Sequence, residues 1–154
     1  MTWARTIMVG LANPRTAEHL VRMGIALARE GAGRLIVVGI VVVPPQQSLS
    51  SAARPARTQR RLLRRAAQIA QAEGVQAETL VRAGHQVDEA LTAVALEVEA
   101  SLLVVGWSAR QRYAAPSDSA LWRLSQEPPC DILAVRRNDR QNTTPRNILL
   151  PIRG

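Results

Sequence analysis

The sequence is poor in aromatic residues and has no lysine. Aromatic residues make up 3% of its 154 residues and phenylalanine is absent, so the core must be built from Val, Leu, Ile and Ala. With 47% hydrophobic residues, a chain of this length fits one domain with a substantial core. The longest apolar run, residues 35–43, is too short to span a bilayer, so no transmembrane segment is expected.

Residues of the kinds that build catalytic or metal sites are few. The one cysteine, Cys130, excludes an internal disulfide bond and fits a reducing compartment. His19 and His85 are far apart and lack ligand-like neighbours, so no metal site is expected. No Ser/His/Asp or Cys/His arrangement stands out, so we do not expect an enzyme. The first ten residues lack signal-peptide features, which favours the cytoplasm or the cytosolic side of a membrane-protein parent.

All twenty basic residues are arginine, and they exceed the twelve acidic residues to give a net charge of +8. No acidic residue occurs between Gly31 and Ala72, whereas seven arginines do. Those between Arg57 and Arg65 recur at helical spacing and share one face. A charged helix face is usually solvated, and no aromatic interleaving or helix-turn-helix spacing accompanies this one. Nucleic acid and anionic lipid are therefore not expected partners.

Apolar runs alternate with amphipathic patterns along the chain. Strands are expected at residues 6–11, 34–43, 75–81, 102–105 and 132–135. Helices are expected at residues 15–30, 56–73 and 87–98 and just before Pro128, with a loop at 46–55 and a turn at 83–84. The alternation predicts a three-layer, doubly wound α/β fold, in which helices cover both faces of a parallel sheet of about five strands. Ligands bind such sheets where strand order reverses, which places a crevice beyond the first and fourth strands.

Three segments carry a resemblance to a known family. They are residues 81–84 (VRAG), 101–106 (SLLVVG) and 129–135 (PCDILAV). Over about residues 5–137 the chain resembles the universal stress protein family, whose closing Pro-Cys-Pro-Val strand has Asp131 in place of its second proline here. The resemblance implies a flavodoxin-like strand order of 3-2-1-4-5. It also implies a homodimer formed through the edge strand that contains Ile132, Leu133, Ala134 and Val135.

The family's nucleotide-binding members have an acidic residue after the first strand and a G-x-x-G-x9-G-[S/T] loop after the fourth. Ala12 stands in the position of the acidic residue, and Gly106 matches the first glycine of the loop. Ala109 stands in the position of the second glycine, and the loop is one residue short. Asp118 and Ser119 occupy the positions of the third glycine and of the hydroxyl residue.

These departures weaken the case for a nucleoside triphosphate. Ala12 has no carboxylate to accept hydrogen bonds from ribose or adenine, and Ala109 adds a Cβ where phosphate would approach. Asp118 either places negative charge near the phosphates or is the N-cap of a helix that begins near Ser119. No cofactor is therefore predicted, and ATP is not an expected ligand. The resemblance then implies a regulatory or association domain without the usual ATP-binding activity.

The alternative is a stress protein that binds another nucleotide or small molecule in the degenerate crevice. Gly106, Ser108 and Ser119 would then supply backbone and hydroxyl donors to that ligand. This ligand would lie in the crevice between Leu11 and Gly106.

The last residues suggest a further unit. After a domain at residues 1–137 and a polar linker at 138–145, residues 146–154 repeat the pattern of residues 5–11, an arginine and a polar residue before an apolar run. They are either the truncated start of a second copy or an extra strand at the sheet edge. Domains of this family also resemble C-terminal segments of amino-acid permeases and cation antiporters. The expected partners are thus a second copy, a tandem domain or a membrane-transporter parent.

Overall fold

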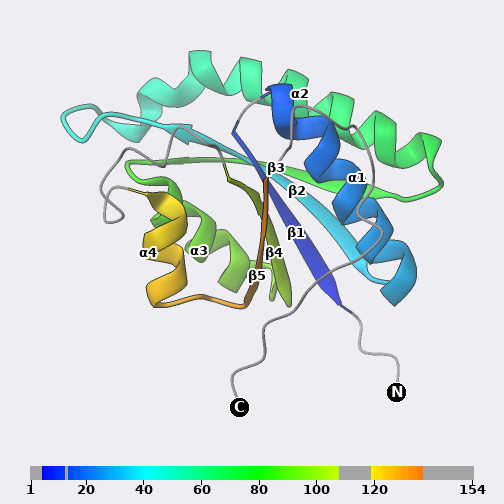
Figure 1. Cartoon of the computed structure of the whole chain (residues 1–154). Helices are drawn as coiled ribbons and strands as arrows, with labels where there is room; N and C mark the ends of the chain where they lie inside the picture. Colours follow the sequence, from blue (N-terminus) through cyan, green and yellow to red (C-terminus); the bar gives the residue numbers. More distant parts are fainter. Residues whose placement is uncertain (1–4, 13, 108–118, 137–154) are drawn as a thin grey trace.

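The computed structural model of the chain, which describes residues 5–12, 14–107 and 119–136, is built around one parallel sheet (Figure 1). The sheet has five strands in the order β3-β2-β1-β4-β5, as the sequence predicts. The strands are β1 (Thr6–Leu11), β2 (Arg34–Val42), β3 (Ala77–Gly84), β4 (Leu102–Gly106) and β5 (Asp131–Val135). The helices are α1 (Pro14–Gly31), α2 (Ala53–Ala72), α3 (Val87–Glu97), α4 (Ala120–Gln126) and the short 3-10 helix η1 (Leu49–Ala52).

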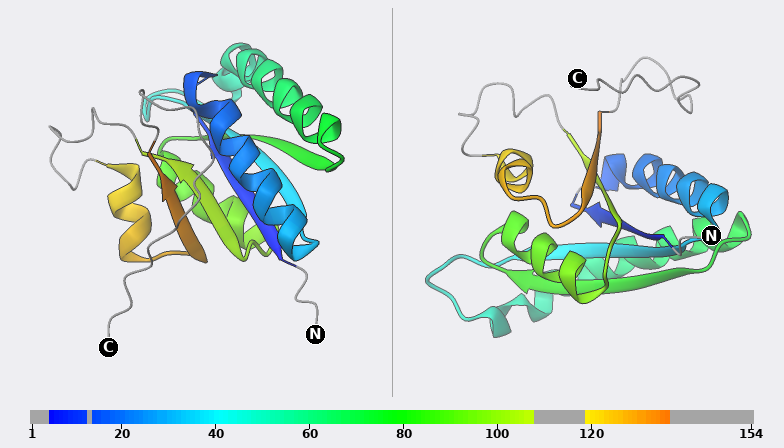
Figure 2. Two further views of the ribbon diagram at one scale, coloured as in Figure 1. Left: turned by 45° about the vertical axis from the view of Figure 1, so that its right-hand side comes forward. Right: turned by 90° about the horizontal axis from the view of Figure 1, so that it is seen from below.

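Helices cover both faces of the sheet and make three layers (Figure 2). Side chains alternate along β1, so Ile7 and Val9 join the cluster under α1 and α2, whereas Met8 joins the cluster under α3 and α4. β2 is buried along nearly its whole length because both of its faces are covered. Its almost continuous Val and Ile sequence follows from this position, and the predicted doubly wound α/β fold is confirmed.

α1 packs closely on the sheet because a glycine faces it. The apolar face of α1 buries Leu20, Val21 and Ile25 at helical spacing. A Cβ on Gly24 would lie 2.5 Å from Val9 Cγ2, which is closer than two carbon atoms can approach. Gly24 therefore sets the distance between α1 and the centre of the sheet.

The third strand differs from its predicted boundaries. β3 begins at Ala77 and ends at Gly84, so the Ala83-Gly84 pair predicted as a turn is the last part of the strand. These two residues remain in the sheet because they pair in register with Val41 and Val42 of β2. The prediction of a turn was wrong because local turn propensity is weaker here than pairing with the neighbouring strand.

The polar segment predicted as a loop at residues 46–55 is partly helical. η1 occupies Leu49–Ala52, and α2 begins directly after it at Ala53. Pro55 is tolerated because the first turn of a helix leaves its N–H groups without partners inside the helix. The predicted start of this helix near residue 56 was therefore too late.

Of the helices in the described part of the chain, none combines the length and hydropathy that a bilayer span requires. The linker predicted at residues 138–145 lies outside the described residues. So does the segment at 146–154, predicted as an extra strand or a second copy.

Candidate functional site

The predicted crevice lies where the strand order reverses, beyond the C-terminal ends of β1 and β4. These strands are parallel neighbours, and Gly10 of β1 pairs with Val105 of β4. Ala12 follows the end of β1 and is exposed, and Gly106 is the last residue of β4. The fold thus brings these two predicted site residues to adjacent strand ends, as expected for a doubly wound sheet.

Gly106 lies close to α1. A Cβ at this position would lie 3.2 Å from Leu20 Cδ1 and 3.9 Å from Thr16 Oγ1, both on α1. A carbon–carbon contact of 3.2 Å is tight, so the Leu20 side chain would have to move to admit a Cβ at position 106. Gly106 therefore matches the family's loop and also meets a requirement of helix packing that involves no ligand.

Ser119 lies at the other end of the predicted loop. It occupies the N-cap position of α4, with extended backbone, and its hydroxyl makes no capping hydrogen bond. The helix begins at Ala120, one residue later than an Asp118 cap requires, so that prediction was wrong in position. Ser108, Ala109 and Asp118 themselves lie outside the described residues.

α4 is fixed to the rest of the fold by one apolar and one charged contact. Leu124 is buried in the cluster that contains residues of α3 and β4. Arg123 Nη2 lies 2.8 Å from Asp88 Oδ1 in the first turn of α3. These contacts hold the Ser119 end of the loop in the α3 layer of the fold.

Trp107 and Arg136 form a pair that the sequence did not reveal. The Trp107 backbone N–H donates a hydrogen bond of 2.8 Å to the Val135 carbonyl, which keeps the ends of β4 and β5 together. Trp107 is 41% exposed, and the Arg136 guanidinium lies 5.7 Å from the centroid of its ring, within range of a cation–π contact. The signal is the register: Gly106 pairs with Val135, so the residues that follow them are neighbours.

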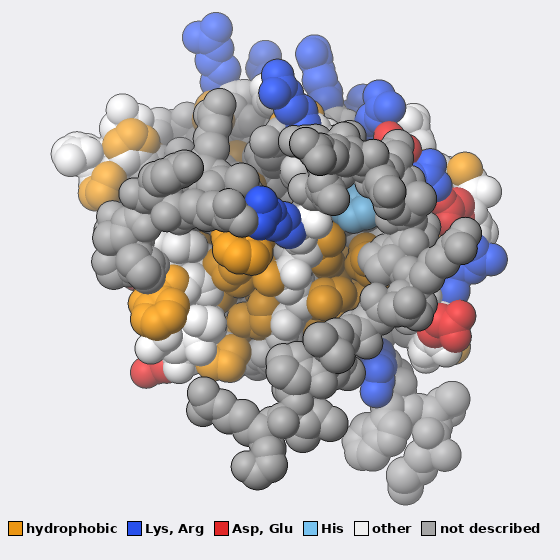
Figure 3. All heavy atoms as spheres, in the orientation of Figure 1, with side chains coloured by type: hydrophobic (Ala, Val, Ile, Leu, Met, Phe, Trp, Pro, Cys, Tyr) orange, Lys and Arg blue, Asp and Glu red, His pale blue; other side chains and the backbone are white. Residues whose placement is uncertain are grey.

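β5 is the edge strand that was predicted to carry a dimer. It is the last strand in the sheet order and pairs with β4 along one of its two sides. Ile132, Leu133 and Val135 are partly buried and Ala134 is exposed. Hydrophobic side chains also reach the surface around β5 and α4, where Trp122 is 47% exposed (Figure 3).

Cys130 precedes this edge strand and is partly buried. Burial raises the pKa of the Cys130 thiol, and the charge of Asp131 raises it further, whereas a backbone hydrogen bond from Leu103 acts in the opposite direction. The protonated thiol is a weak nucleophile. Within the described ranges, no group of three His, Cys, Asp or Glu residues is placed to hold a metal ion.

Comparison with known proteins agrees with this architecture. The chain is 27% identical over 123 residues to the Na(+)/H(+) antiporter NhaS5 of Synechocystis sp., a match that covers 76% of the chain but 18% of the antiporter. It therefore spans about a fifth of the length of that relative.

Solved structures give the same picture. A universal stress protein family member from Burkholderia pseudomallei is 26% identical, with a TM-score of 0.67 over 86% of this chain and 96% of that one. The universal stress protein from Archaeoglobus fulgidus in complex with dAMP is 16% identical, with a TM-score of 0.66 over 87% and 98% of the two chains, and shows the same fold. The sequence profile of the universal stress protein family matches residues 4–136. The chain belongs to the universal stress protein family.

Proposed function

We propose that the chain is a regulatory domain that acts by association and does not use the ATP site of its family. The observation that carries the proposal is Ala12, which stands beyond β1 beside the end of β4. It presents a methyl group at the position where a carboxylate would accept hydrogen bonds, so a nucleoside placed there leaves polar groups unpaired. Gly106 is weak support for a ligand, because close packing against Leu20 also favours a glycine there.

The sequence of the loop after β4 supports the same proposal. Ala109 replaces a glycine, and Asp118 adds a negative charge to the segment that would face phosphate. Like charges at about 4 Å cost roughly 1–4 kcal/mol at effective dielectric constants between those of water and a protein surface. Together with Ala12, these residues remove both the nucleoside contact and the phosphate contact.

The test is calorimetric titration of the purified chain with ATP, ADP and AMP, beside the variants Ala12→Asp and Ala12→Asn. We expect no micromolar binding by the wild type. A gain of binding in Ala12→Asp, without a gain in the uncharged Ala12→Asn, would assign the loss to the missing carboxylate. Micromolar binding of any of the three nucleotides by the wild type overturns the proposal.

A second candidate function keeps a ligand in the crevice. It is supported by the Archaeoglobus fulgidus relative, which was solved in complex with dAMP, and by Ser119, whose hydroxyl makes no capping hydrogen bond to α4. In this function the Ser119 hydroxyl, which α4 does not use as a cap, would donate a hydrogen bond to the ligand. Native mass spectrometry of the purified chain tests this function, and a co-purified nucleotide or other small molecule would favour it over the first.

We also propose a membrane-transporter parent or partner for the domain, on the strength of the antiporter relative. Fractionation of source cells, with antibodies against this chain, tests the proposal. Detection in the membrane fraction within a protein much larger than 16.8 kDa would support a covalent parent. Detection at 16.8 kDa, confined to the soluble fraction, would contradict both arrangements.

A further inference from the structure

The outer side of α2 carries most of the excess charge of the chain. We call it the basic face, and it consists of Arg54, Arg57, Arg60, Arg61, Arg64 and Arg65, all exposed. Without these six, fourteen arginines stand against twelve acidic residues, so the net charge of +8 falls to +2. The charge is therefore a local property of one helix and not a general property of the surface.

Of the arginines elsewhere in the described part of the chain, four have acidic partners within ion-pair distance: Arg22, Arg34, Arg82 and Arg123. Arg34 pairs with Glu78 at 3.0 Å, and Arg82 pairs with Glu97 at 2.7 Å. On the basic face, Arg65 has a loose contact of 3.9 Å with Glu18. The other five arginines form no ion pair with any carboxylate in the described part of the chain. Their charge is left for an external partner.

The geometry of the basic face fits an extended surface. At 100° per residue the six arginines span an arc of about 140°, and they extend about 16 Å along the helix. The opposite side of α2 is buried against the sheet through Leu63, Ala66 and Ala70. α2 lies beside α1 in the layer that covers one face of the sheet (Figure 1), and basic side chains project from the upper edge of the molecule (Figure 3).

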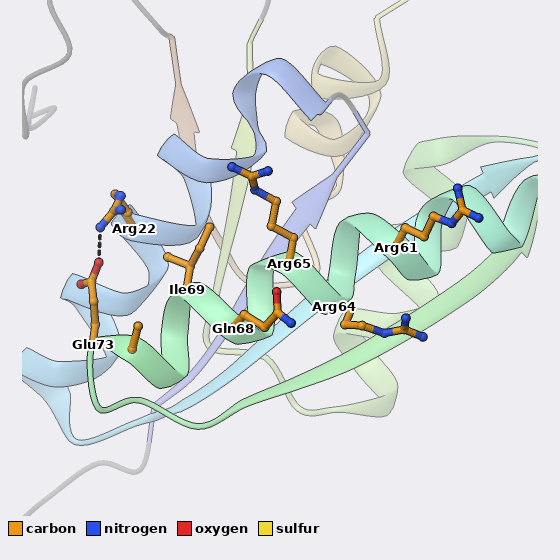
Figure 4. A pocket seen from close by; sticks show the side chains of 8 residues that line it. Arg22, Arg61, Arg64, Arg65, Gln68, Ile69 and Glu73 are labelled. Carbon is orange, nitrogen blue, oxygen red and sulfur yellow. Dashed lines mark hydrogen bonds and ion pairs between the residues drawn. The ribbon is translucent and has the colours of Figure 1, made fainter.

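A single small anion is a poorer fit. The hollow beside α2 measures about 490 Å³ and is lined by Arg61, Arg64 and Arg65. Their guanidinium groups point in different directions and do not converge (Figure 4). At one end of the hollow, Arg22 is already bound to Glu73. A row of separate anionic groups matches this arrangement better than one phosphate.

We propose that the basic face docks on a bilayer surface rich in anionic lipid, which reverses the expectation drawn from the sequence alone. Clustered arginines are attracted electrostatically to such a surface, and this attraction does not depend on a binding groove. Leu49 lies in η1, four residues before α2 begins, and is 44% exposed, so an exposed apolar side chain precedes the charged helix. Membrane-surface helices combine basic and apolar side chains in this way. α2 has no aromatic residue on which bases would stack. The choice of membrane over nucleic acid also rests on the proposed link to a transporter.

The test is co-sedimentation of the purified chain with vesicles of phosphatidylcholine, with and without 30% phosphatidylserine. We expect binding to the anionic vesicles at low salt, weakened strongly by about 0.5 M NaCl because the charges are exposed. Each arginine near an anionic surface contributes a factor of about five, so Arg61→Gln with Arg64→Gln lowers the affinity by about 30-fold. Circular dichroism checks that this variant is folded.

The matched control removes two charges from the opposite end of the fold, through Arg29→Gln with Arg34→Gln. We expect it to change vesicle affinity by less than threefold. Absence of binding to anionic vesicles overturns the proposal, as does an equal loss in both double variants, which indicates a general charge effect. Tighter binding to a DNA oligonucleotide than to vesicles overturns it in favour of nucleic acid. None of these readouts depends on ATP or on a parent protein, so this proposal and the proposed function can fail separately.

Discussion

Arg123 Nη2 lies 2.8 Å from Asp88 Oδ1 and connects α4 to the first turn of α3. The Asp88 side chain is 12% exposed, and apart from this ion pair its Oδ1 has no hydrogen-bond partner among the described residues. A carboxylate so nearly buried needs a compensating charge, which the guanidinium supplies. The pair thus fixes the helix that follows the loop at the candidate crevice.

Removal of the guanidinium is expected to destabilise the fold. Arg123→Met should lower the free energy of unfolding by about 1–2 kcal/mol, less than for a fully buried pair because the Arg123 side chain is 36% exposed. The double variant with Asp88→Asn should lose less than the sum of the two single variants. Urea denaturation followed by circular dichroism measures all three. Glu89→Gln, at an exposed neighbour, is the control, and strict additivity in the double variant would contradict the pairing.

Gly24 predicts a cost for adding one methyl group. In Gly24→Ala the new Cβ would lie 2.5 Å from Val9 Cγ2, so α1 or the strand must shift. Such overpacking costs about 1–3 kcal/mol, which outweighs the gain of up to about 1 kcal/mol in helix propensity. Gly31→Ala on the same helix is the control, because a Cβ on Gly31 would lie 3.7 Å from its nearest neighbour, Arg5 Cδ, which is an ordinary van der Waals distance. Equal unfolding midpoints for the two variants would show that α1 adjusts freely.

The fold was predictable because buried strands and helices each require a characteristic spacing of apolar residues in the sequence. The continuous apolar run of β2 follows from burial on both faces, and the spacing of Leu20, Val21 and Ile25 follows from one buried helix face. The end of β3 was not predictable in this way. Ala83 and Gly84 have turn propensity, and their strand conformation depends on partners in β2 more than forty residues away.

The sequence predicted where the candidate site lies in the sheet, but it did not predict the side-chain contacts and the helix boundary around that site. Ala12 and Gly106 could be assigned to adjacent strand ends because strand order alone fixes the point of reversal. The Trp107–Arg136 contact could not, because it depends on the register of β4 against β5. Ser119 as the N-cap of α4 was missed by one residue, since helix boundaries depend on backbone geometry that composition does not fix.

The edge of β5 predicts a dimer that one proline should dissociate. The Val135 carbonyl faces β4, because it accepts the Trp107 N–H, so the N–H of Ala134 points away from β4. Ala134→Pro removes that outward donor and leaves the bonds to β4 in place. We expect a dimer for the wild type and a monomer for Ala134→Pro in analytical ultracentrifugation. Ala134→Thr keeps the N–H and should remain dimeric; a dimer in all three proteins would exclude this edge.

We expect the Cys130 thiol to react slowly with alkylating reagents, at a rate that depends on the neighbouring Asp131. After burial, the charge of Asp131 is the second cause that raises the pKa of the thiol. Asp131→Asn should therefore lower this pKa and speed alkylation by iodoacetamide at pH 8, by at most about tenfold for one pKa unit. Glu127→Gln removes one negative charge from an exposed position nearby and should leave the rate unchanged. Equal rates in the wild type and Asp131→Asn would remove Asp131 as a cause.

The same thiol predicts how stability changes with pH. Because the pKa of Cys130 is higher in the folded state, the unfolded chain loses the thiol proton first as the pH rises. The contribution of the protonated thiol is complete below the unfolded pKa, about 8.5, and is lost as the pH rises through the folded value. Urea denaturation between pH 7 and 10 should show a steeper alkaline loss of stability for the wild type than for Cys130→Ala. Parallel profiles would mean that ionisation of this thiol is not linked to folding, because only a difference in pKa between the two states can separate them.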